Sequence, residues 1–265
     1  DLAKKDILDS IGVTLAGSGA QGCREIVQLL ADMGEGGKSN ILVYGNNVSP
    51  NNAALANASM AHAMDFDDDY EPGTPHVGIT VVPAALAISQ YIGGVNGKDF
   101  ISAVILGIDV ICRLCLATKP YNRPRLGWMY TPLYGYFSVA AAVGRLLELS
   151  REEMSNAFGI AYAQAAGNLE CIPSGALTKR FQAGFAASGG LLSALMASRG
   201  ITGAHSFLEG TYGLFNVYLR DDYDSNVLIA DLGKRFELEN LSFKPYPCGR
   251  PIHSTIDAAL ELVET

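Results

Sequence analysis

Apolar residues recur at the period of an α-helix along most of the chain, and glycines and prolines separate the periodic stretches. Near the N-terminus, Ile7, Leu8, Ile11 and Leu15 fall on one helical face, and the pattern stops at Gly17. The same period predicts helices over residues 2–15, 26–33, 50–62, 79–92, 97–117, 133–148, 151–166, 178–199 and 252–263. The sequence therefore predicts a mainly α fold.

Several predicted helices begin with residues that favour a helix start. Ser49 followed by Pro50 is typical of an N-cap and the first helical position. Asn96 precedes another helix, and Ser150 with Glu153 has the spacing of a capping box. These residues support the helical assignment independently of the apolar period.

The pattern changes near the end of the chain. Residues 236–247, FELENLSFKPYP, alternate and are bounded by prolines, which predicts a strand, and residues 41–44 predict another short extended piece. We therefore expect a large all-α helical domain over residues 1–235, followed by the beginning of a smaller α+β domain over residues 236–265. Because one strand and one helix do not make a sheet, we expect this second domain to be incomplete.

Composition and charge restrict the class of protein. Of 265 residues, 49% are apolar and 17% charged, so much of the chain must lie in a core. The most apolar stretch, residues 100–117, carries Asp109 and Arg113 four positions apart, where they can pair on one helix face. This favours a buried core helix over a membrane span. A net charge of −8 disfavours nucleic acid as a partner. No signal peptide is visible, and we expect a cytoplasmic protein.

The five cysteines are odd in number and scattered, which is typical of reduced thiols. Cys112 and Cys115 form a CxxC pair inside an apolar helix, with no second CxxC pair and no nearby pair of histidines. We therefore predict core residues here and expect no metal site.

Carboxylates and histidines gather in residues 62–78, HAMDFDDDYEPGTPHVG. It holds His62, His76 and a run of carboxylates between two apolar helices. Burying such a cluster costs free energy unless its carboxylates reach solvent, a ligand or one another. This stretch is therefore the first candidate for a functional site.

Cations stand at two predicted helix starts. Lys179 and Arg180 open one helix, where positive charge opposes the helix dipole, and an anion held by free backbone N–H groups and these side chains would offset that cost. Lys244 and Arg250 precede the last helix, with His253 close by. Solvated surface cations are the alternative at either place. Beside an Asp/His cluster, the two pairs together predict a small di- or tricarboxylate as substrate.

Three segments of the chain resemble the MmgE/PrpD family in order and spacing: HAMDFDDDYEPGTPHVG, SGALTKRFQAGFAASGGLLSALMASRGITGAHSFLEGTYG and FKPYPCGRPIHSTIDAALEL. The family includes 2-methylcitrate dehydratase, cis-aconitate decarboxylase and iminodisuccinate epimerase. The resemblance implies an all-α domain with a smaller α+β domain, a homodimer, and an active site in the cleft between the domains. It also implies a protein that continues past residue 265.

Carried over to this sequence, the resemblance implies four catalytic residues, Asp65, His76, Lys179 and Lys244. The candidate substrate-binding residues are Asp69, Arg180, Tyr246, Arg250 and His253. Asp69 stands where related enzymes often have threonine, which leaves its role open.

Two positions depart from the pattern of the family. Met129 and Gln182 stand where many members have histidine. Both changes remove a group that can transfer protons. They leave open a divergent substrate or a weakened enzyme.

The family's reactions build negative charge on carbon next to a carboxylate, which requires a base or acid and nearby cations. His76 is the natural acid or base because its ordinary pKa lies near neutral pH. Asp65 would orient it or act as the base, and Lys179 and Lys244 would hold substrate carboxylates. We expect a lyase that uses no metal or other cofactor, with 2-methylcitrate dehydration as first choice and decarboxylation or epimerisation as alternatives.

Other interpretations stay open for several residues. His62 would hold the shape of the loop, and Asp67 and Asp68 would bond loop N–H groups. Cys248 and His205 would be structural. Two further protein classes compete with the lyase. One is a helical enzyme that binds magnesium and diphosphate through residues 65–69 and 221–224, and the other is a non-catalytic helical binding protein.

Overall fold

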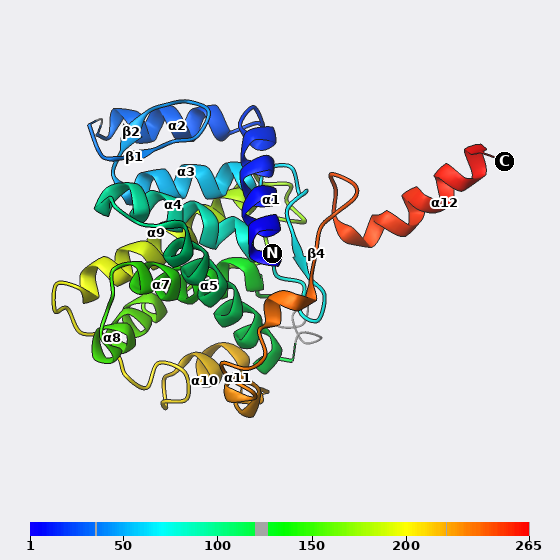
Figure 1. Ribbon diagram of the computed structural model, residues 1–265. Helices are drawn as coiled ribbons and strands as arrows, with labels where there is room; N and C mark the ends of the chain where they lie inside the picture. The colour runs from blue at the N-terminus through cyan, green and yellow to red at the C-terminus, as the bar shows by residue number, and fades with distance from the viewer. Residues whose placement is uncertain (35, 120–126, 221, 265) are drawn as a thin grey trace.

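The computed structural model describes residues 1–34, 36–119, 127–220 and 222–264 (Figure 1). Its helices are α1 Leu2–Gly17, α2 Cys23–Asp32, α3 Pro50–Ala61, α4 Gly78–Ile92, α5 Gly97–Ala117, α7 Tyr130–Leu146, α8 Arg151–Tyr162, α9 Thr178–Ala197, α10 Leu214–Leu219, α11 Asn226–Ile229 and α12 His253–Glu264. The described strands are β1 Ser39–Asn40, β2 Asn47–Val48, β3 Asp69–Tyr70 and β4 Leu241–Ser242. The prediction of a mainly α fold is confirmed.

The core forms where α3, α4, α5, α7 and α9 pack together, with α7 against both α5 and α9 (Figure 1). Small residues allow this close packing. A Cβ added at Gly184 of α9 would lie 2.2 Å from Ser59 Oγ of α3, and one at Gly190 would lie 2.5 Å from the backbone oxygen of Tyr136. Such contacts leave room only for glycine, so the helices that carry the site are held in fixed positions.

The three predicted helix caps are confirmed. The Ser49 hydroxyl accepts a hydrogen bond from Asn52 N–H, and the Ser150 and Glu153 capping box is complete. Asn96 caps α5 through its side-chain oxygen. Helix α7 begins at Tyr130 rather than at residue 133, because a proline in the first turn removes no intrahelical hydrogen bond.

Both predicted strands are largely wrong. Residues 42–44 form a turn, and the extended pair Ser39–Asn40 precedes it. Residues 237–240 form a 3-10 helix, and only Leu241–Ser242 pairs as a strand. The alternation of apolar and polar residues does not predict the structure here, because the consecutive residues Glu237 and Leu238 are both buried.

Strand β4 pairs antiparallel with β3, which lies inside the acidic stretch, so that Asp69 faces Ser242 and Tyr70 faces Leu241. A buried polar network holds the same segment in place. The Tyr70 hydroxyl donates to Glu237 Oε2 at 2.7 Å, and Glu237 N–H donates to Asp109 Oδ1 at 2.9 Å. These contacts bring residues near 240 onto the acidic loop and thereby position the lysine two residues after β4.

Helix α5 confirms the predicted pair, with Arg113 Nε 2.6 Å from Asp109 Oδ2. Among the described residues it is the one helix whose length and composition would allow a membrane span, and 61% of its apolar window is buried within the structure. Such burial is typical of a core helix. Cys112 and Cys115 are both fully buried, as predicted for core residues.

The last part of the chain extends away from the helical body and ends in α12 (Figure 1). Its apolar side chains Leu260, Leu262 and Val263 are exposed. The boundary between residues 235 and 236 stays a prediction. Asp221, the first residue of the second proposed magnesium-binding segment, lies outside the described residues.

Candidate active site

The acidic stretch forms a loop between α3 and α4 and lies against the start of α9. Its backbone turns sharply at Asp65, whose φ of 54° lies in the left-handed region that L residues rarely adopt. Two lysines hold this residue. Lys179 Nζ lies 2.9 Å from Asp65 Oδ1, and Lys244 Nζ lies 2.8 Å from the Asp65 carbonyl oxygen and 3.4 Å from Oδ1.

This arrangement joins three segments that are far apart in the sequence and sets the charge of Asp65. Burial alone would raise the pKa of its carboxyl, but Lys179 and Lys244 outweigh burial and lower the pKa to about 2. Asp65 is therefore ionised across the physiological range, and it does not serve as a proton donor. Its carboxylate instead holds two ammonium groups at the same point.

The same residues line a cavity of about 630 Å³. Its walls are formed by Asp65, Asp69, Glu71, Thr74, His76, Met129, Tyr130, Thr131, Ile172, Lys179, Lys244, Gly249, Arg250 and Pro251. All four predicted catalytic residues are therefore brought together. A cavity with several cations on one wall can hold the carboxylates of a small substrate.

His76 reaches this cavity with a side chain that is 16% exposed. Its Nδ1 lies 2.7 Å from the Asp68 carbonyl oxygen, which can only accept, so Nδ1 carries the proton. Its backbone N–H donates to Thr131 Oγ1 at 2.8 Å. Burial lowers the pKa of His76 and the Asp67 charge opposes that shift. The Nε2 atom is the one left for chemistry in the cavity.

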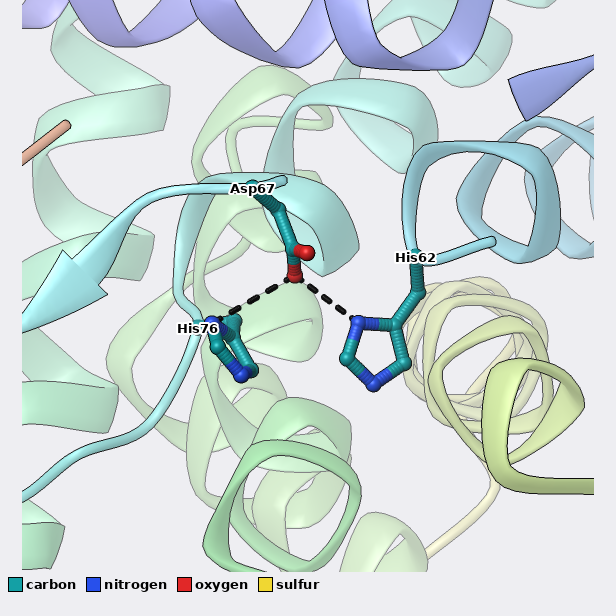
Figure 2. Close-up of side chains that lie close together, drawn as sticks. All are labelled: His62, Asp67 and His76. Atoms are coloured by element: carbon teal, nitrogen blue, oxygen red, sulfur yellow. Dashed lines mark hydrogen bonds and ion pairs between the residues drawn. The ribbon is translucent and has the colours of Figure 1, made fainter. Parts of the chain in front are cut away.

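Asp67 lies behind His76 and is fully buried. One of its oxygens, Oδ2, is 2.8 Å from His62 Nδ1 and 3.4 Å from His76 Nδ1, and Figure 2 shows both imidazoles turned toward it. Burial raises the pKa of Asp67, but the two histidines outweigh it and hold the pKa well below its ordinary value.

Three ligand-type atoms of His62, Asp67 and His76 lie within 4.8 Å of one another, a spacing that a metal ion could use. The hydrogen bonds argue against that use of Nδ1. The carbonyl partner of His76 and the carboxylate partner of His62 both require a proton on that nitrogen. The group therefore fits a hydrogen-bonded relay better than a metal centre.

A second set of carboxyl groups lies on the inner side of the loop. Asp68 accepts hydrogen bonds from Val77 and Gly78 N–H at the start of α4, as the sequence analysis predicted for its side chain. Asp6 of α1 packs against the same point, and neither of its oxygens has a hydrogen-bond partner in the described structure. Burial, and next the charge of Asp9, raise the pKa of Asp6 to about 7.

The predicted substrate-binding residues separate into two groups. Asp69 and Arg250 line the cavity, where Arg250 also forms an ion pair with Glu71. Arg180, Tyr246 and His253 do not line it in the described structure. Arg180 Nη1 donates to the Gln21 carbonyl, Tyr246 donates to Asp257, and His253 Nε2 lies 3.3 Å from the Cys248 carbonyl.

The expected free N–H groups at the start of α9 are also occupied. Lys179 N–H donates to the Ala176 carbonyl and Arg180 N–H to the Leu177 carbonyl. An anion would therefore be held here by the lysine side chain and not by the helix end.

Sequence reasoning missed the side of the cavity formed by Tyr130, Thr131 and Ile172. The Thr131 hydroxyl accepts a hydrogen bond from the backbone N–H of His76. In the sequence, the only indication of this residue was its place next to a proline in the first turn of α7. For Ile172, no sequence pattern distinguishes a cavity-lining side chain from any other loop residue.

The two positions where histidines of the family are missing lie next to each other. Gln182 Nε2 is 3.7 Å from Met129 Sδ, and it also bonds the Asn168 carbonyl at 3.0 Å. Met129 lines the cavity, whereas Gln182 lies behind it and holds the loop after residue 167. This side of the cavity therefore presents the thioether of Met129, at a position where the resemblance to the family implies histidine.

The sequence model of the MmgE/PrpD N-terminal domain matches residues 1–226. This match covers most of the chain. The chain belongs to the MmgE/PrpD family. Cis-aconitate decarboxylase of Aspergillus terreus is 30% identical over 97% of the chain and 54% of its own length. The proteins of the same name from Mus musculus and Homo sapiens are each 28% identical over 97% of the chain. The chain spans about half the length of these relatives.

These relatives are named as decarboxylases and not as 2-methylcitrate dehydratases. Asp65, the first carboxylate of the cluster at residues 65–69, pairs with two lysines, which disfavours a magnesium and diphosphate site there.

Proposed function

We propose that this chain forms the helical part of a lyase that decarboxylates a small unsaturated tricarboxylate of the cis-aconitate type. The observation that carries the proposal is the convergence of Lys179 and Lys244 on Asp65 beside His76 in one cavity. The names of the relatives support the same reaction.

The cations would bind the substrate as a polyanion. Lys244 is buried, and a buried ammonium needs anionic partners, which Asp65 supplies only in part. Lys179 and Arg250 face the same cavity from other segments. Three cations around one cavity suit three carboxylates, because charge-assisted hydrogen bonds to carboxylates are among the strongest that a protein makes.

The reaction then needs one proton at a defined carbon. As the bond to the leaving carboxylate breaks, its electron pair forms a new double bond. The electrons of the old double bond move to the carbon beside another carboxylate. Protonation of that carbon gives carbon dioxide and methylenesuccinate. His76 would supply this proton from Nε2, the nitrogen left free by the Nδ1 contact with Asp68, and would regain it from water.

The test uses the full-length protein with cis-aconitate, citrate, 2-methylcitrate and iminodisuccinate, each offered separately in D2O and followed by NMR. We expect carbon dioxide from cis-aconitate and one deuteron in the new methylene group of the product. Loss of water from 2-methylcitrate, or racemisation of iminodisuccinate, would replace decarboxylation with that activity. No turnover of any of the four would contradict the proposal.

A further inference from the structure

The residues behind His76 form a connected group that the proposed reaction does not itself use. Asp67 is fully buried and sits between His62 and His76 without touching the cavity. Figure 2 shows the two imidazoles with Nδ1 turned toward Asp67 and Nε2 turned away. A buried carboxylate shared by two rings is costly unless its charge is compensated, so its place behind a cavity histidine calls for a physical reason.

We propose that Asp67 is a positioning residue that holds the His76 ring with Nε2 toward the cavity and stabilises its protonated form, while His62 braces Asp67 from the other side. The inference rests on the proposed function, because it assigns His76 as the proton donor. It adds two residues, Asp67 and His62, that do not touch the substrate.

The contact distances support this division of labour. The Asp68 carbonyl, 2.7 Å from His76 Nδ1, fixes which nitrogen carries the proton. Asp67 Oδ2, at 3.4 Å from the same nitrogen, is too far for a strong hydrogen bond but near enough for a strong electrostatic effect. Asp67 therefore contributes mainly charge and the carbonyl contributes orientation.

His62 restrains the carboxylate. Its Nδ1 donates to Asp67 Oδ2 at 2.8 Å, shorter than the distance to His76, so the shared oxygen stays close to His62. The two ring centres are 5.1 Å apart. His62 thus limits how much of the Asp67 charge reaches His76. Removing Asp67 should therefore lower the proton affinity of His76, and removing His62 should raise it.

Several charged and titratable groups besides Asp67 and His62 set the proton affinity of His76, and the variants below leave those groups unchanged. Burial, His62 and Lys244 lower the pKa of His76, while Asp67 and Asp69 raise it. Replacing Asp67 therefore removes one of the carboxylates that favour the imidazolium. Replacing His62 removes one of the groups that disfavour it.

The experiment titrates the His76 ring of the full-length protein by 15N NMR without substrate, and measures the pH profile of kcat in parallel. In D67N, which keeps the size of the side chain, we expect the pKa of His76 to fall by about 1–3 units. The limb of the kcat profile that reports the protonated ring should move to lower pH by the same amount. The value of kcat near neutral pH should fall at least about tenfold.

His62→Leu should move the pKa of His76 and the kcat limb to higher pH, the opposite direction. His62→Gln retains a donor for Asp67 and should stay closer to the unmodified protein than His62→Leu does. The matched control is D68N, which makes the same change at an equally buried neighbour that caps α4. It should lower stability without lowering the pKa of His76 as D67N does.

The two proposals fail separately. If the titrations shift as expected but no substrate is decarboxylated, the proposed function is wrong while the positioning role of Asp67 stands. An unchanged His76 pKa in D67N, or shifts in the same direction in D67N and His62→Leu, would overturn the inference. So would stoichiometric zinc binding that D67N abolishes, because the metal would need the lone pairs of protonated nitrogens. If D67N does not fold, the His62 variants alone decide the question.

Discussion

Asp65 and Asp6, which lie on opposite sides of the acidic loop, have pKa shifts in opposite directions. On the cavity side, Asp65 meets two lysines, and its pKa falls to about 2 against the effect of burial. On the inner side, burial and neighbouring carboxyls raise the pKa of Asp6 to about 7 and that of Asp9 to about 6. Asp65 is thus kept ionised, whereas the environment of Asp6 and Asp9 favours the neutral form of the carboxyl.

This difference separates function from architecture. On the cavity side, Asp65 holds the ammonium groups of Lys179 and Lys244 where a polyanion would bind. These contacts also join the loop to α9 and to the segment after β4. The inner side packs Asp6 against Gly78, where a Cβ would lie 2.6 Å from its carboxyl oxygen. We expect changes on the cavity side to affect turnover and changes on the inner side to affect the pH dependence of stability.

The largest effect should come from His76→Ala. Loss of a general acid typically lowers the rate by about 10²–10⁴-fold, and we expect kcat for cis-aconitate to fall within that range. The control is His205→Ala, since His205 contacts Ser155 away from the cavity. Full activity of His76→Ala would remove the cavity side from the mechanism.

Lys179→Met should come next. It removes an ammonium that contacts Asp65 and faces the cavity, so kcat/KM should fall about 10–100-fold, the range for a hydrogen bond to a charged group. Initial rates over a range of substrate concentrations measure this fall. Lys119→Met is the matched control, because Lys119 pairs with Asp222 at the surface. Equal activity of both variants would show that Lys179 only fastens the loop.

Asp6→Asn tests the inner side through stability. The folded pKa of about 7 exceeds the ordinary value of 3.8, so the folded state holds this proton more tightly than the unfolded chain does. The contribution of Asp6 to stability is full below about pH 4 and is lost as pH rises through 7. The amide cannot ionise, so Asp6→Asn should be more stable than the unmodified protein at pH 8, by up to about 4 kcal/mol, and not at pH 4.

Urea unfolding of both proteins at the two pH values measures this difference. Asp32→Asn, at an exposed position, is the control and should show no such dependence on pH. A constant difference between Asp6→Asn and the unmodified protein at both pH values would mean that Asp6 is ionised in the fold, as Asp65 is.

The smallest effect should come from Glu71→Gln at the rim of the cavity. Exposed ion pairs contribute about 0–1 kcal/mol, so releasing Arg250 from Glu71 should lower KM by at most about fivefold and leave kcat unchanged. Steady-state kinetics in low salt measures the change. A large fall in kcat would instead place Glu71 in the mechanism.

Much of this arrangement could be predicted from the sequence. The apolar period and the caps at Ser49, Asn96 and Ser150 identify the helices, because these signals act within one or two turns of chain. The resemblance to the family singled out the four residues that the cavity brings together. Local sequence was less informative near residue 237, where burial of a glutamate by Tyr70 produced a 3-10 helix in place of a strand.

The available groups follow from the amino-acid sequence: a loop rich in carboxylates, lysines in two later segments, and methionine and glutamine where the resemblance to the family implies histidines. Which of these groups meet depends on how the helices pack. The pairing of β3 with β4 brings Lys244 to Asp65, whereas Arg180, next to Lys179 in the chain, points to Gln21. The charge of each carboxyl likewise depends on whether a cation or a second carboxyl lies within a few ångströms, and that distance is set by packing between helices far apart in the sequence.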